Sequence, residues 1–249
     1  PSPQQPYVGV SAFAHKAGLH ASAVKVDPDL YQHIDPAQVG NDMRMLVSSM
    51  AGRASVELKG RELGYDLSGE KARKVVDKVK DLEAQGYTFE AADASFELLL
   101  REELNGERTR HFDVESWRVI VEQRPDGEVI SEATVKLHAK GERIVCTGEG
   151  NGPVNALDRA LRTALERLFP ELARMELTDY KVRILELGGR GTGAVTRVLQ
   201  ETSDCEATWS SVGVDQNVIA ASWQAMEDAV TYGLLRAGYE ADTAGRTGE

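Results

Sequence analysis

The chain has 249 residues, of which 41% are hydrophobic and 28% charged, a composition typical of a globular protein with its own core. Its formal net charge of −11 argues against a nucleic-acid or anionic-membrane partner, because both carry negative charge. The sequence contains no stretch of about 18 apolar residues, so it predicts no membrane span. The Pro/Gln-rich beginning lacks the basic and apolar regions of a signal peptide.

The first 106 residues are predicted to form a mainly helical linker module. Small residues from Ala14 to about Val24 predict a short helix, which Asp27-Pro28 ends. A loop is expected from Tyr31 to Asn41, where Pro36 and Gly40 interrupt the chain. Apolar residues at helical spacing predict three further helices: about 51–63, 68–86 with Ser68 as N-cap, and 91–104.

The first of these segments holds an unusual density of acid/base groups. Three of the five histidines, His15, His20 and His33, lie there together with Lys16 and Tyr31. An imidazole gives or takes a proton near neutral pH, and a phenol donates to a developing oxyanion. We therefore expect chemistry in this segment, although an exposed basic pair and a structural His33 are ordinary alternatives.

After Gly106 the apolar residues alternate, which predicts strands. Three strands, about 112–121, 133–139 and 143–148, precede an amphipathic helix that Pro153 opens and Pro170 stops. The same order returns at an offset of roughly 65 residues, with strands at about 180–187, 194–202 and 207–212 and a helix at about 217–236. Gly213 falls on Gly148 in this alignment.

These patterns predict an α+β fold with three parts. A helical linker module at 1–106 is followed by a pseudo-symmetric pair of βββα units at 107–238 and by a polar, disordered tail at 239–249. One βββα unit cannot cover both faces of its sheet, so the two copies should pack together. Cys146 and Cys205 have no C-x-x-C partner, and we expect reduced thiols in a cytoplasmic protein.

Two glycine-rich stretches are candidate binding loops. Gly150-Asn151-Gly152-Pro153 leads into a helix start, where backbone N–H groups and the helix dipole attract an anion such as an amino-acid carboxylate. Gly191-Thr192-Gly193 joins two predicted strands. A nucleotide phosphate is disfavoured because there is no G-x-x-x-x-G-K-[ST] motif. Tight turns that need a positive φ are the alternative reading of both loops.

Four stretches carry a resemblance to a known family, in the order SAFAHKAGLHASAV, YQHIDPAQVGN, LVSSMAGRASVELKG and ASFELLLREELNG. They resemble the segments that follow the catalytic barrel in the 2-isopropylmalate, homocitrate and citramalate synthases, and most of all the citramalate synthases. The resemblance extends to about Gly238. It implies that the chain is the C-terminal portion of such a synthase, made of a linker and a regulatory domain.

The resemblance also implies what this portion lacks. Such synthases begin with a TIM barrel of about 250 residues or more, and no part of that barrel is in this sequence. The divalent metal and the acetyl-CoA site are expected on the missing barrel, so we expect no metal site and no cofactor here and no activity of this portion alone. The expected partners are a second copy of the chain, an amino-acid effector and the N-terminal barrel of the parent chain.

His20 and Tyr31 match the linker histidine and tyrosine of the family. The resemblance implies that they assist catalysis by reaching the barrel of a partner subunit. The alternatives are a capping or surface role for His20 and a packing role for Tyr31.

The resemblance predicts a citramalate synthase, which condenses acetyl-CoA with pyruvate in isoleucine synthesis and binds isoleucine as a feedback effector. One alternative is a 2-isopropylmalate synthase that senses leucine. Another is a stand-alone amino-acid-binding dimerisation module without catalytic involvement.

Overall fold

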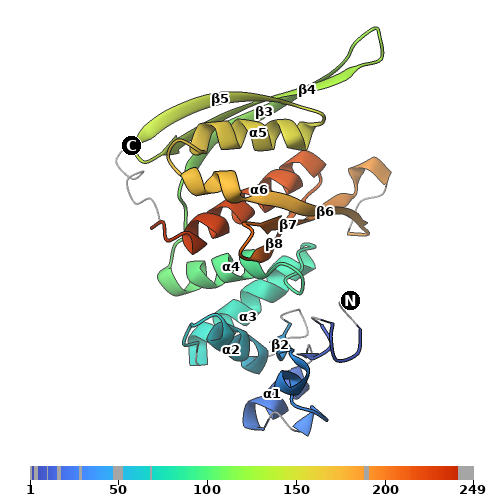
Figure 1. Cartoon of the computed structure of the whole chain (residues 1–249), viewed down its shortest axis with the longest axis vertical. Helices are drawn as coiled ribbons and strands as arrows, with labels where there is room; N and C mark the ends of the chain where they lie inside the picture. Colours follow the sequence, from blue (N-terminus) through green and yellow to red (C-terminus); the bar gives the residue numbers. More distant parts are fainter. Residues whose placement is uncertain are drawn as a thin grey trace. The chain divides into compact units, whose positions relative to one another are not determined.

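The computed structural model describes residues 2, 5–9, 11–15, 18–27, 30–46, 53–67, 69–187 and 191–240 (Figure 1). The chain divides into two compact units. The first contains Pro1–Glu90 and Glu103–Gly106, and the second contains Ala91–Glu102 and Glu107–Glu249. No helix among the described residues is both long and apolar enough to cross a membrane.

The first unit is mainly helical, as predicted. Its helices are α1 (Gly18–Val26), α2 (Arg53–Glu62), α3 (Gly69–Ala84) and the short 3-10 helix η2 (Pro36–Val39). The valines of α3 face inward, and Val75 and Val79 are almost fully buried. The predicted start of α2 near Ala51 and the predicted cap Ser68 lie outside the described residues.

The expected helix start at Ala14 is wrong. Ala14–His15 instead forms a short strand, β1, which runs parallel to β2 (Arg44–Met45). Backbone bonds from Arg44 N to Phe13 O (3.1 Å) and from Leu46 N to His15 O (2.9 Å) hold the pair. Helix α1 therefore begins at Gly18, because the preceding backbone already pairs with a distant segment.

The second unit contains the predicted repeat of three strands and a helix. Its first sheet has the order β3-β4-β5 and its second the order β6-β7-β8, and both are antiparallel. The strands are β3 (Asp113–Gln123), β4 (Val129–Ala139), β5 (Glu142–Gly150), β6 (Glu176–Leu185), β7 (Val195–Ser203) and β8 (Thr208–Asp215). The helices are α4 (Asp93–Asn105), α5 (Pro153–Leu165) and α6 (Val218–Arg236), with 3-10 helices η3 (Pro170–Arg174) and η4 (Gly191–Gly193).

Helix α5 packs on β4 and β5, and α6 packs on β7 and β8, with the two helices in contact (Figure 1). A Cβ at Gly148 would lie 2.5 Å from Ala160 N, and a Cβ at Gly213 would lie 1.9 Å from Ala221 O. Both positions thus need glycine for the same close approach of helix to strand. Gly213 and Gly148, which align in the sequence repeat, therefore occupy matching structural positions.

One core joins the two halves of the repeat. Val135 and Leu137 of β4 and Leu157 and Leu161 of α5 are buried in it together with Trp223 of α6. The Trp223 ring lies 6.0 Å from the Trp117 ring of β3, so α6 contacts the first sheet as well as its own. The two βββα copies therefore stabilise each other, as their one-sided sheets require.

The first two residues of the predicted tail, Tyr239 and Glu240, are held by contacts with the second unit. Tyr239 packs edge-on against Phe169 with 5.0 Å between ring centroids, and its hydroxyl donates to a Glu171 carboxylate oxygen. The carbonyl of Glu240 bonds His111 Nδ1 at 3.0 Å. Residues 241–249 of the predicted tail lie outside the described residues.

Candidate functional site

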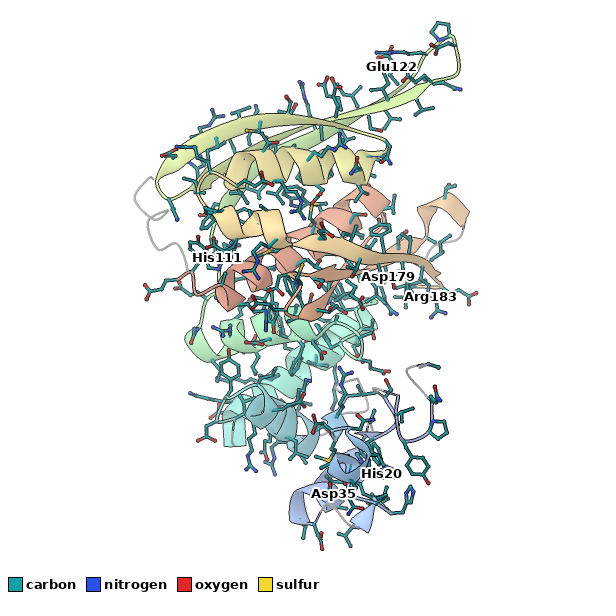
Figure 2. The ribbon with its side chains drawn as sticks, viewed as in Figure 1. His20, Asp35, His111, Glu122, Asp179 and Arg183 are labelled. Atoms are coloured by element: carbon teal, nitrogen blue, oxygen red, sulfur yellow. The ribbon has the colours of Figure 1, made fainter. Side chains whose placement is uncertain are left out.

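The first candidate site is a group of aromatic rings in the first unit. The His20 ring of α1 stacks on Tyr31 with centroids 4.2 Å apart and an interplanar angle of 30°. His15 of β1 meets His20 edge-on at 6.4 Å. Figure 2 shows His20 together with Asp35 in this part of the first unit. The structure thus brings together three of the residues that the sequence singled out, while Lys16 lies outside the described residues.

His15 has one ring nitrogen buried away from solvent. Its Nε2 atom is buried and has no hydrogen-bond partner among the described residues. Burial lowers the pKa of His15, and the neighbouring His20 lowers it further. A neutral imidazole is therefore favoured at neutral pH, and its ring nitrogens can accept or donate one hydrogen bond each.

Neighbouring polar contacts hold the segment around the rings in place. Tyr7 Oη lies 3.2 Å from His33 Nε2, so His33 has a local partner. The Asn41 amide donates to Tyr7 O (2.9 Å) and Gly9 O (2.8 Å), and Asp35 caps η2 through Ala37 N at 3.0 Å. The bonds of Tyr7 and Asn41 tie the residues before β1 to the segment after α1.

The second candidate site is a cavity of about 480 Å³ where the N-terminus of α5 meets the second sheet. Apolar and polar side chains share its wall. The lining residues are Asn151, Gly152, Pro153, Val154, Asn155, Asp158, Leu177, Tyr180, Gln200 and Met226. Its volume lies within the range of about 300–1,000 Å³ that is usual for small-molecule sites.

The N-terminus of α5 presents backbone donors at this cavity. Gly152 is the N-cap and makes no side-chain cap bond, and the first intrahelical bond runs from Ala156 N to Gly152 O at 2.9 Å. The N–H groups of Val154 and Asn155 precede that bond and have no intrahelical acceptor. In α6, by contrast, the Asn217 side chain accepts from Ile219 N at 2.8 Å. The end of α5 is therefore suited to an anion.

A buried amide faces the same cavity from β7. Gln200 is 6% exposed, and its Oε1 atom has no hydrogen-bond partner among the described residues. Its Nε2 atom donates to Thr202 Oγ1 at 3.4 Å, a weak bond. A buried acceptor without a donor costs roughly 1–3 kcal/mol. A ligand with an N–H group would remove that cost.

Two further lining groups already have protein partners. Tyr180 Oη lies 2.6 Å from Ser222 Oγ, which anchors β6 to α6. Both carboxylate oxygens of Asp158 accept from Arg162 Nε, at 3.0 and 2.9 Å. Gln200 and Tyr180 were not predicted as site residues from the sequence. The available signal was a glutamine at an inward position of a strand, two residues after the fully buried Val198.

The predicted glycine loops have different surroundings. Asn151, Gly152 and Pro153 line the cavity. Gly150 does not line the cavity. A Cβ at Gly150 would lie 2.6 Å from Ala156 N, so this glycine permits the packing of α5 on β5. Gly191–Gly193, with Thr192 between them, form the exposed turn η4 before β7 and are not part of the cavity wall. The structure therefore brings only the first loop to this cavity.

The described residues contain no group of three or more His, Cys, Asp or Glu side chains placed to hold a metal ion. Free thiols are present at Cys146, which is partly buried, and at Cys205, which is exposed. The two candidate sites offer imidazole, phenol, amide and backbone N–H groups, which suit proton transfer and the binding of small polar ligands.

Comparison with known proteins assigns both units. Residues 90–234 match the LeuA allosteric (dimerisation) domain, and residues 7–87 match the homocitrate synthase post-HMGL domain-like family. The (R)-citramalate synthase of Streptomyces coelicolor is 70% identical over 240 residues, which cover 96% of this chain and 45% of that protein.

More distant relatives give the same picture. The (R)-citramalate synthase of Aquifex aeolicus is 46% identical over 93% of this chain and 44% of its own length. The 2-isopropylmalate synthase of the same organism is 31% identical over 95% of this chain and 43% of its own length. This chain thus spans less than half the length of these relatives. It belongs to the family of the LeuA allosteric (dimerisation) domain, joined to a homocitrate synthase post-HMGL domain-like segment.

Proposed function

We propose that the chain is the linker and regulatory portion of a citramalate synthase, which condenses acetyl-CoA with pyruvate, and that it binds isoleucine as a feedback effector. The observation that carries the effector role is the cavity at the α5 N-terminus, with an uncapped helix end and the unpartnered Gln200 amide oxygen on its wall. The high identity to (R)-citramalate synthases supports the choice of synthase.

The proposed binding mode uses both charges of a free amino acid. Its carboxylate accepts from the N–H groups of Val154 and Asn155, where the helix dipole is favourable. Its ammonium donates to Gln200 Oε1. Its aliphatic side chain packs against Leu177 and Met226. An aliphatic amino acid therefore complements each part of this wall.

Leucine is the alternative effector, because a 2-isopropylmalate synthase is 31% identical over 95% of this chain. A stand-alone amino-acid-binding and dimerisation module is the alternative from outside enzymology. That reading keeps the cavity and predicts no role for the rings around His20.

The proposed contribution to catalysis comes from the ring group. Tyr31 is 44% exposed and stacked on His20, so its hydroxyl can reach a substrate oxygen supplied by another domain. His20 would carry the proton, and His15, whose buried Nε2 lacks a described partner, is the competing candidate for that role. The metal and the acetyl-CoA site would belong to the proposed barrel.

A homodimer is the proposed assembly, and the second sheet offers a surface for it. Val182 and Ile184 of β6 are 48% and 67% exposed. They pair with Val198 and Thr196 of β7, which are buried. Paired residues share one face of an antiparallel sheet, so Val182 and Ile184 continue the face that carries α6 on to the edge strand β6. A second copy that covers this apolar strip would give a symmetric interface. Ile184→Lys should then shift the chain from dimer to monomer in sizing experiments, and an unchanged dimer would place the interface elsewhere.

The deciding experiment is calorimetric titration of the chain with isoleucine, leucine, valine and threonine, beside a sizing run. Saturable binding with isoleucine preferred supports the citramalate synthase proposal, whereas a preference for leucine supports the 2-isopropylmalate alternative. A well-folded dimer that binds none of the four would exclude the effector role and leave a dimerisation module.

A further inference from the structure

A buried polar node fastens α4 to the remainder of the second unit. Ser95 Oγ of α4 donates to Asp228 Oδ2 of α6 at 2.6 Å. The same hydroxyl accepts from Val212 N of the edge strand β8 at 3.0 Å. One side chain thus satisfies an edge N–H group and a buried carboxylate at once. Arg108, which follows α4, donates to Asp228 Oδ1 at 2.5 Å.

Burial works against the negative charge at the centre of this node. Asp228 is 9% exposed, and burial raises its pKa to about 6. Arg108 and Ser95 lower that pKa and the neighbouring Glu227 raises it, but burial is the largest influence. The partners therefore return less than the desolvation of the carboxylate costs.

Helix α6 connects the node to the cavity. Met226 lines the cavity and lies two residues before Asp228 on the same helix. One turn earlier, Ser222 holds the hydroxyl of Tyr180, which also lines the cavity. A ligand that packs against Met226 and Tyr180 therefore presses on the helix whose opposite contact is the node. A continuous helix transmits such a shift because its backbone is hydrogen-bonded throughout.

The position of α4 in the chain gives the node a regulatory meaning. Residues 91–102 of this segment belong to the second unit and residues 103–106 to the first. Helix α4 is therefore a segment that both units share. Cores and packed contacts are bistable rather than continuously deformable, so a small shift can be amplified here.

We propose that the Ser95–Asp228–Arg108 node couples occupation of the cavity to the seating of α4. This inference rests on the proposed effector site. Isoleucine in the cavity holds α6 against the second sheet, keeps Asp228 in contact with Ser95 and so slows the opening of α4. The node is a positioning element and does not touch the ligand.

Hydrogen exchange of the chain with and without saturating isoleucine tests the coupling. In the wild type, isoleucine should slow exchange of the α4 amides by about fivefold or more, the lower end of usual coupling between sites. Ser95→Ala should leave the isoleucine Kd within about threefold and reduce that slowing to below twofold, since the usual factor of coupling is then lost. Thr163→Ala, which removes an exposed hydroxyl bonded to its own helix, is the matched control and should behave as wild type.

Asp228→Asn keeps the shape of the node and removes its charge, so it serves if Ser95→Ala does not fold. It should bind isoleucine and show a weakened response of α4. Binding of isoleucine with unchanged α4 exchange in the wild type would overturn the inference and leave the effector site standing. A full response of α4 in both variants would also overturn it. Absence of isoleucine binding in calorimetry would instead refute the effector site itself.

Discussion

Replacing Gln200 with leucine tests the proposed binding mode most directly. The change nearly keeps the size of a side chain that lines the cavity, and it removes a buried amide oxygen that has no hydrogen-bond partner among the described residues. A hydrogen bond to a charged group contributes roughly 1.5–3 kcal/mol. Since about 1.4 kcal/mol corresponds to a tenfold change, the isoleucine Kd should rise by roughly 10- to 150-fold.

The stability of the protein should change little in this variant. Gln200 now buries an unsatisfied acceptor, and its bond to Thr202 is long at 3.4 Å. Leucine removes the cost of the acceptor and leaves the Thr202 hydroxyl without that weak partner, so we expect an equal or slightly higher Tm. Calorimetric titration gives the affinity, and thermal unfolding followed by circular dichroism gives the stability.

Gln123→Leu is the matched control, because Gln123 is an exposed glutamine of β3 outside the cavity wall. It should bind isoleucine as the wild type does. The reasoning is refuted if Gln200→Leu binds isoleucine within twofold of the wild type while it folds normally. A loss of binding with an equal loss of Tm would indicate damage to the fold and not loss of one contact.

Three other outcomes follow from the structure. Gly213→Ala should lower the free energy of unfolding by roughly 1–3 kcal/mol in urea titrations, because a Cβ would meet Ala221 O, whereas Gly193→Ala has open space and should be neutral. Burial raises the pKa of Asp228 to about 6 in the folded protein, against 3.8 in the unfolded chain. The contribution of Asp228 to stability is therefore full below pH 3.8 and is lost as the pH rises through 6. Asp228→Asn should flatten the pH dependence of the free energy of unfolding between pH 4 and 6 by up to about 3 kcal/mol. In a complete synthase, His20→Ala should lower turnover more than it raises the KM for the oxo acid, and unchanged turnover would remove His20 from the mechanism.

Much of the fold was predictable because its elements are set by local spacing. Alternating residues in β4 and the helical spacing of Leu157 and Leu161 in α5 each describe one buried face, and these faces are the ones the structure buries. The repeat was also visible, since Gly148 and Gly213 recur at matching positions and both permit close packing of a helix on a strand.

The predictions that differ from the structure concern contacts between residues far apart in the sequence. The expected helix at Ala14 gives way to β1 because Arg44 and Met45 offer a partner that no local pattern reveals. Helix α4 was grouped with the helices before it, yet Ser95 bonds Asp228 and Val212, which are more than a hundred residues away. Tyr239 was predicted to lie in the tail, although its ring packs edge-on against Phe169.

The sequence by itself determined most of the helices and strands and which of their faces are apolar, because both depend on the short-range spacing of apolar residues. The tertiary structure decided which groups meet. It placed Gln200 and Tyr180 of the second βββα unit of the chain at the N-terminus of α5, which belongs to the first βββα unit. It kept Gly191–Gly193 away from that cavity. A binding site is a meeting of surfaces from different elements, and their separation in space depends on the packing of the whole core.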